Sequence, residues 1–204
     1  MIGTSRRVRV AYAYRRIRQL GVVNLLRGLY VRHQFSSAGI LSVRAGWPLP
    51  KVDNMGGSVA IGNCSLFPGV RIECWKGASV NIGNGTYINR NTEIVAAQSV
   101  FIGRDCKIAR DVLIMDTDQH PVGSAPMVHG PVKIGDRVWV GSRVIVLKGV
   151  SIGHDSIIGA GAIVTKSIPP HSVVVGQAAR VVRTLCPEGG PSTPNDELHG
   201  TLRA

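Results

Sequence analysis

A branched aliphatic residue recurs at every sixth position between residues 132 and 170 of this 204-residue chain. No other feature constrains the fold as strongly. A helix repeats every 3.6 residues and a strand every two, so neither sustains a period of six. The period is typical of a solenoid that turns a corner every six residues, so that three sixes close one triangular coil. The residues that open the sixes are Ile134, Val140, Val146, Ile152, Ile158 and Val164.

The repeat starts earlier in the chain, in a less regular form. Its earlier openers are Ile61, Phe67, Ile82, Ile88, Ile94, Ile102, Ile108 and Ile114. Twenty residues separate Ile114 from Ile134, so about fourteen residues are inserted after the third coil. We therefore predict an all-β solenoid of about five triangular coils over residues 58–175, interrupted by a loop at 115–131.

The positive charge is concentrated ahead of the repeat. The formal net charge is +12, and residues 1–52 hold ten Arg and Lys but no acidic residue. Apolar residues at helical spacing predict a basic amphipathic helical segment over 1–33, with a break at Gly21. The helix could pack on the solenoid end or on a neighbouring subunit, lie on a membrane surface, or clamp an anionic substrate. Nucleic acid ranks lower because no known binding motif accompanies the charge.

The remaining segments lack the repeat. Residues 34–57 have no periodicity and are interpreted as a connector. Residues 176–186 follow the repeat as a short extended segment, and the Pro- and Gly-containing polar stretch 187–204 is predicted to be a disordered tail.

Composition also restricts the cellular setting. The four cysteines are widely spaced without a C-x-x-C pair, which is typical of reduced thiols in a cytoplasmic protein. No apolar run approaches the ~20 residues of a membrane span. Arginines 15, 16 and 18 interrupt the region where a signal peptide would be apolar. We expect a cytoplasmic protein, with the basic segment as the one candidate for contact with the inner face of the cell membrane.

Functional side chains are expected where the repeat is broken, because regular coils bury most of their residues. The 115–131 loop contains Asp116, Asp118, His120 and His129. Pro121 stiffens the backbone at His120, and the two acids are near enough in sequence to orient its imidazole. From this chemistry alone, His120 is equally a site residue or a surface residue. The other histidines are interpreted as exposed bystanders: His33, His154, His171 and His199.

Three features together resemble the hexapeptide-repeat acyltransferases. They are the repeat itself, the run D-T-D-Q-H-P at 116–121 and the run G-A-G-A-I-V-T-K-S-I-P-P at 159–170. The resemblance covers about residues 57–183 and is closest to galactoside, maltose and nodulation-factor O-acetyltransferases and their polysaccharide-modifying relatives. The repeat alone implies only a left-handed parallel β-helix, whereas the two runs are more specific.

The resemblance implies a homotrimer with acetyl-CoA, as co-substrate, in the groove between subunits, and no metal. His120 matches the general base that takes the proton of an acceptor hydroxyl, and a neutral imidazole can do this near neutral pH. Asn89 matches an acceptor-binding asparagine, although it is equally interpreted as a turn residue. Asp118 is a second candidate for acceptor binding. No acyl-enzyme is required, so no cysteine has to act as a nucleophile.

The cofactor side of the resemblance lies in the later coils. Three cationic residues, Lys166, Arg180 and Arg183, could bind the phosphates of CoA near the C-terminal end of the solenoid. Trp139 could line the channel of the pantetheine arm or serve only in packing. The full set of expected CoA-binding residues is Trp139, Ser142, Ala160, Thr165, Lys166, Arg180 and Arg183.

The predicted function is acetyl-CoA-dependent O-acetylation of a saccharide hydroxyl, such as that of a cell-envelope, capsular or exopolysaccharide precursor. Ala96 and Ala97 replace an acidic pair of the galactoside enzymes, which leaves the acceptor open. A serine-acetyltransferase-like enzyme for a non-sugar molecule and a non-catalytic scaffold are the alternatives. A γ-type carbonic anhydrase would need a H-x-x-x-x-H pair, but His120 and His129 are nine positions apart.

Overall fold

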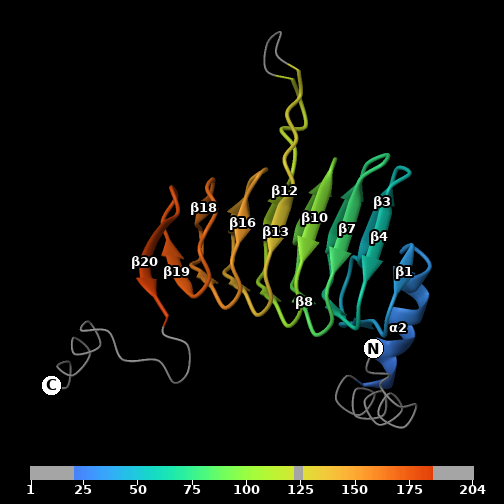
Figure 1. The fold of residues 1–204 in the computed structure, drawn as a ribbon. Helices are drawn as coiled ribbons and strands as arrows, with labels where there is room; N and C mark the ends of the chain where they lie inside the picture. Colours follow the sequence, from blue (N-terminus) through green and yellow to red (C-terminus); the bar gives the residue numbers. More distant parts are fainter. Residues whose placement is uncertain (1–20, 122–125, 186–204) are drawn as a thin grey trace, which may run out of the picture.

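A computed structural model of the chain describes residues 21–121 and 126–185. It is a parallel β-solenoid with one short helix at its N-terminal end (Figure 1). The predicted all-β solenoid is therefore confirmed. The predicted helix before Gly21 and the predicted tail 187–204 lie outside the described residues.

The strands form three sheets, which we call sides A, B and C in chain order. Side A consists of β1 (Ser37–Ala38), β4 (Ser58–Ile61), β7 (Ser79–Ile82), β10 (Ser99–Ile102), β13 (Val132–Ile134) and β16 (Ser151–Ile152). Side B consists of β2 (Ser42–Val43), β5 (Ser65–Leu66), β8 (Tyr87–Ile88), β11 (Lys107–Ile108), β14 (Trp139–Val140), β17 (Ile157–Ile158), β19 (Ser172–Val175) and β20 (Arg180–Thr184). Side C consists of β3 (Lys51–Asn54), β6 (Arg71–Cys74), β9 (Glu93–Ala96), β12 (Leu113–Met115), β15 (Ile145–Val146) and β18 (Ile163–Val164).

Most residues that open the sixes stack in register along the solenoid, but at the predicted opener Phe67 the core position belongs to Leu66, which pairs with Ile88. Ile134 pairs with Ile152 on side A, and Val140 pairs with Ile158 on side B. These side chains are buried and form one continuous core through the coils. Because burial of apolar area is the main stabilising contribution, this column of branched aliphatic side chains accounts for the period of six.

The solenoid begins one coil earlier than predicted. Strands β1, β2 and β3 pair with β4, β5 and β6, so the segment 34–57, predicted as a connector, forms a first coil and brings the total to six. Its core-facing residues are Ala38, Val43 and Val52. They are spaced by five and nine positions rather than six, which hides the coil from a search for the repeat.

Helix α2 (Val22–Arg32) covers the N-terminal end of the solenoid (Figure 1). It begins after Gly21, whose φ of 77° lies in the left-handed region that glycine adopts readily. Gly28 and Val31 are buried against the first coil, and a β-carbon on Gly28 would collide with the carbonyl of Leu41. Packing on the solenoid end is therefore confirmed for this face of the helix. Within the described residues, no helix has the length and apolar character needed to cross a membrane.

Candidate functional site

The 115–131 loop leaves the solenoid after β12, at the corner between sides C and A, and projects away from the coils (Figure 1). Its two limbs pair at the base, where Thr117 and His129 form an antiparallel bridge. The backbone N–H of Asp118 donates to the Val128 carbonyl at 3.2 Å, and that of Gly130 donates to the Asp116 carbonyl at 2.8 Å. The loop therefore has an ordered root.

Asp116 fixes this root to the coil before it. Its buried carboxylate accepts the backbone N–H of Ala97 at 2.7 Å through one oxygen and that of Gln98 at 2.8 Å through the other. A buried carboxylate is stable only with such donors. Both oxygens are thus used by the backbone, and Asp116 is a structural anchor rather than a partner of an imidazole.

His129 and Asp118 also hold the root. The Nδ1 atom of His129 lies 2.9 Å from the Thr117 hydroxyl, and the imidazole meets the ring of Trp75 edge to face at 6.2 Å between centroids. Asp118 forms an ion pair with Lys148 of the next coil, and both side chains are about one-third exposed. No local sequence pattern indicates the contact between His129 and Trp75, because it joins residues 54 positions apart.

His120 lies just beyond this root and is exposed. Gln119 has a φ of 61°, and its N–H donates to the Thr117 hydroxyl at 3.0 Å, so the backbone turns sharply ahead of His120. Among the described residues, no hydrogen bond or ion pair of the His120 side chain occurs. Within the described residues, the backbone turn sets the position of His120.

The other predicted site residues lie at different corners. Asn89, Ser142 and Ala160 share the corner between sides B and C, where the hydrogen bond from Gly161 N–H to Ser142 O links successive coils at 2.9 Å. The Oδ1 of Asn89 accepts the N–H of Arg90 at 2.8 Å, so its turn function is present whether or not it binds an acceptor. Trp139, on β14, is 51% exposed on the outer face of side B.

The predicted phosphate-binding residues are not gathered into one cluster by a single chain. Thr165 and Lys166 follow β18 at the corner between sides C and A. Arg180 and Arg183 lie on β20, which pairs antiparallel with β19 at the end of side B. His120 and Lys166 thus share one corner, whereas Asn89, Ser142 and Ala160 share another.

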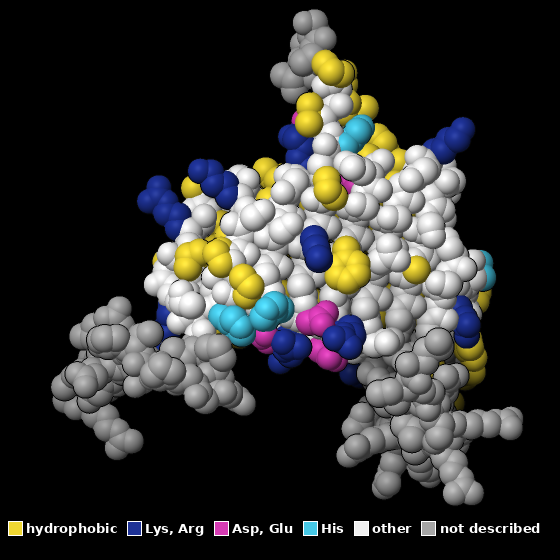
Figure 2. Space-filling view, viewed as in Figure 1, with side chains coloured by type: hydrophobic (Ala, Val, Ile, Leu, Met, Phe, Trp, Pro, Cys, Tyr) yellow, Lys and Arg dark blue, Asp and Glu magenta, His cyan; other side chains and the backbone are white. Residues whose placement is uncertain are grey.

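An open groove of about 880 Å³ runs along the outer face of side A. Phe101, Lys133 and Arg137 line it together with the Pro169–Pro170 turn, and none of the predicted site residues does. Figure 2 shows this side, with hydrophobic and basic groups on the face and a band of acidic, basic and histidine side chains along one edge.

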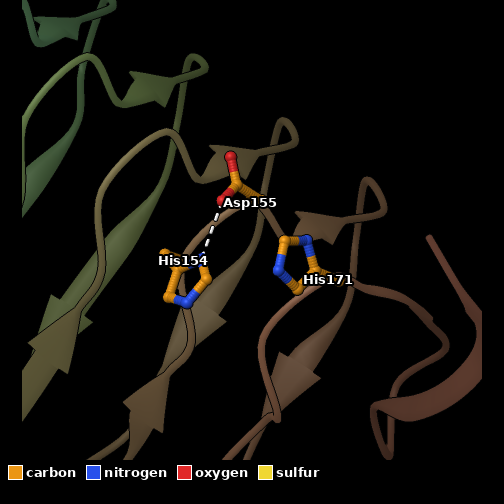
Figure 3. Close-up of side chains that lie close together, drawn as sticks. All are labelled: His154, Asp155 and His171. Atoms are coloured by element: carbon orange, nitrogen blue, oxygen red, sulfur yellow. Dashed lines mark hydrogen bonds and ion pairs between the residues drawn. The ribbon is translucent and has the colours of Figure 1, made fainter. Parts of the chain in front are cut away.

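His154, Asp155 and His171 come together at the corner between sides A and B (Figure 3). Asp155 accepts two hydrogen bonds from the guanidinium of Arg137, both 2.6 Å, and a third contact of 2.7 Å joins it to Nδ1 of His154. The hydrogen bond from Arg137 is the main cause that lowers the pKa of Asp155 far below its usual value. The two imidazoles meet edge to face at 4.8 Å.

This cluster is an ion-pair network rather than a metal centre. The guanidinium occupies both carboxylate oxygens, and its positive charge opposes a second cation. No other group of three candidate ligands occurs within residues 21–121 and 126–185, and this one has two histidines where a carbonic-anhydrase-type zinc site needs three. His171 is half-buried here, so the prediction of an exposed turn residue holds for His154 but is wrong for His171.

Three of the described cysteines, Cys64, Cys74 and Cys106, are buried and form no disulfide. Burial raises the pKa of the Cys74 and Cys106 thiols, which keeps them protonated. None of the three is suited to act as a nucleophile.

Comparison with known proteins agrees with this geometry. The family model described as the hexapeptide repeat of succinyl-transferase matches residues 131–166. Galactoside O-acetyltransferase of Escherichia coli K12 is 42% identical over 114 residues, which are 53% of this chain and 56% of that protein. The structure of a maltose O-acetyltransferase from Clostridium difficile 630 aligns with a TM-score of 0.54 at 30% identity, over 67% of this chain and 71% of that one.

The chain belongs to the hexapeptide-repeat acetyltransferase family. This hexapeptide-repeat protein is also similar to the structure of a galactoside acetyltransferase in complex with coenzyme A, with 28% identity and a TM-score of 0.55 over 85% of this chain and 90% of that one. The chain spans little more than half the length of the Escherichia coli relative.

Proposed function

We propose that this hexapeptide-repeat protein is an acetyl-CoA-dependent O-acetyltransferase that acts on a hydroxyl of a saccharide. Together with membership of this family, one structural observation supports the proposal. The loop that interrupts the solenoid presents an exposed histidine, His120, beyond a root that is otherwise fully tied to the coils.

In the proposed reaction His120 is the general base. Its neutral imidazole accepts the proton of the acceptor hydroxyl while that oxygen attacks the thioester carbonyl carbon of acetyl-CoA. Backbone N–H groups stabilise the oxyanion. The carbon–sulfur bond then breaks, the acetyl ester remains on the acceptor, and the proton passes to the CoA thiolate.

A homotrimer is part of the proposal. Asn89, Ser142 and Ala160 lie at one corner and His120 lies at another, so a single copy does not bring these three residues to its base. In a symmetric assembly, the loop of one copy can face the B–C corner of the next. Lys166, Arg180, Arg183, Thr165 and Trp139 would then bind CoA in the groove between two copies.

The proposed acceptor is a cell-envelope, capsular or exopolysaccharide precursor. Ala97, at the corner beside the loop root, gives no carboxylate to hold a neutral sugar, and its N–H is taken by Asp116. Asp118 and Asn89 are the polar groups proposed for the acceptor instead. Contact of the basic N-terminal segment with a membrane surface would bring the enzyme close to such precursors.

The decisive experiment is a thiol-release assay with acetyl-CoA and a panel of mono- and oligosaccharides, nucleotide sugars and amino acids. Turnover with a saccharide supports the proposal, whereas turnover only with an amino acid favours the serine-acetyltransferase-like alternative. Calorimetry separates the scaffold alternative, which predicts no acetyl-CoA binding. Lys166→Ala should weaken that binding, and Lys51→Ala, at the opposite end of the solenoid, should leave it unchanged.

A further inference from the structure

Helix α2 has two apolar faces, and the described residues cover only one of them. Gly28 and Val31 face the first coil. The opposite face carries five large apolar side chains that are each between 59% and 67% exposed. At 100° per residue, the five fall within an arc of about 120°. They are Val22, Val23, Leu26, Leu29 and Tyr30, and we call them the outward stripe.

The charged side chains on α2 itself, Arg27 and Arg32, are both basic. Residues 1–52 contain ten basic residues and no acid. A second copy of the helix would bring the same excess of positive charge against the stripe, and like charges at close range oppose association. A surface with an apolar interior and negatively charged outer groups would match both the apolar stripe and the basic residues beside it.

We infer that the outward stripe docks α2 onto the surface of a membrane that contains anionic lipid. The apolar side chains enter the boundary between headgroups and acyl chains, and the arginines bind lipid phosphates. Tyr30 combines an apolar ring with a polar hydroxyl, as side chains at membrane interfaces do. An eleven-residue helix is about 17 Å long, far less than the ~30 Å hydrocarbon core, so α2 lies on the membrane.

This docking orients the whole molecule. Because α2 covers the N-terminal end of the solenoid (Figure 1), the first coil would face the membrane and β20 would point away from it. The inference does not require acetyl transfer, since membrane binding and turnover are measured separately.

Vesicle co-sedimentation of the full chain tests the inference. The protein should bind vesicles of phosphatidylcholine mixed with phosphatidylglycerol, bind phosphatidylcholine alone weakly, and dissociate as salt increases. The double substitution Leu26→Ser and Leu29→Ser should weaken binding on the order of tenfold or more, because two apolar anchors are lost. Val181→Ser with Val182→Ser, at the opposite end of the solenoid, is the matched control and should bind as the wild type does.

Several results would overturn the inference. They are absence of binding to anionic vesicles at low salt, or undiminished binding of the Leu26→Ser and Leu29→Ser variant, which would indicate attraction through arginines alone. A third result concerns the oligomeric state, measured by light scattering. If the wild type does not bind vesicles but forms an oligomer that this variant loses, the stripe contacts a second copy instead. If this variant unfolds, Val22→Ser with Val23→Ser tests the same stripe at the first turn of α2.

Discussion

The unbroken coils at 132–164 and the loop at 115–131 differ in how their polar groups are paired. In the coils, corner N–H groups donate to neighbouring coils, as Gly135 does to Ile152 O and Arg137 to Arg104 O, both at 2.8 Å. In the loop, Asp116, Thr117 and His129 secure the root, and His120 beyond it has no side-chain partner among the described residues. The coils form a regular wall, and the loop presents His120, the proposed general base, beyond its root.

The largest expected effect is on turnover and comes from a substitution in the loop that leaves the coils unchanged. His120→Ala should lower turnover on the order of 10²–10⁴-fold, the contribution of a general base. Because His120 is exposed, the free energy of unfolding should change by less than about 0.5 kcal/mol. Steady-state kinetics and denaturant unfolding measure the two quantities. His33→Ala, an exposed histidine at the end of α2, is the control, and near-normal turnover of His120→Ala would end the proposed mechanism.

The reverse effect is expected in the coils. Ile134 is fully buried between Ile102 and Ile152, so Ile134→Ala should cost about 2–5 kcal/mol of unfolding free energy. Turnover per folded molecule should remain close to that of the wild type. Val182→Ala, on exposed β20, removes comparable apolar bulk and should cost less than about 0.5 kcal/mol. A loss of activity larger than the loss of folded protein would contradict the separation of wall and loop.

The same contrast explains what the sequence could predict. Spacing alone predicts that Ile134 stacks on Ile152, because three sixes close one coil and residues 18 positions apart then share a core position. The interruption after Ile114 located the loop for the same reason. Val43 and Val52 could not be predicted as core residues because their irregular spacing shows no period, although they occupy equivalent positions.

The contacts of the loop root could not be predicted for a different reason. The contacts of Asp116 with Ala97 and of His129 with Trp75 join residues from different coils, and no local pattern records them. The proximity of Asp116 to His120 in the sequence suggested an imidazole partner, but the corner backbone takes both carboxylate oxygens. A residue's function at the junction of coil and loop depends on which coil lies beside it, which only the three-dimensional structure gives.

A smaller effect is expected at that junction. Asp116→Asn replaces one acceptor oxygen with an N–H₂ group facing a backbone donor, which should cost about 1–3 kcal/mol because the site is buried. Loosening of the root should also lower turnover, by less than His120→Ala does. Thermal unfolding and kinetics test both. Asp111→Asn, at an exposed turn with a φ of 59° that asparagine tolerates, is the control. Unchanged stability would show that the anchor is dispensable.

The smallest expected effect lies in the wall, at the ion pair of Arg137 and Asp155. Asp155→Asn should lower the Tm by about 1–4 °C, the size expected of an exposed pair. Its guanidinium partner lowers the pKa of Asp155 in the folded protein, so the stabilisation is complete above the ordinary value of 3.8 and is lost as pH falls toward the folded value. The difference in Tm between wild type and variant should therefore be constant at neutral pH and shrink below about pH 4. Calorimetric scans across this range, with added salt also reducing the difference, measure it. A difference that grows in acid would mean that the pair does not stabilise the wall.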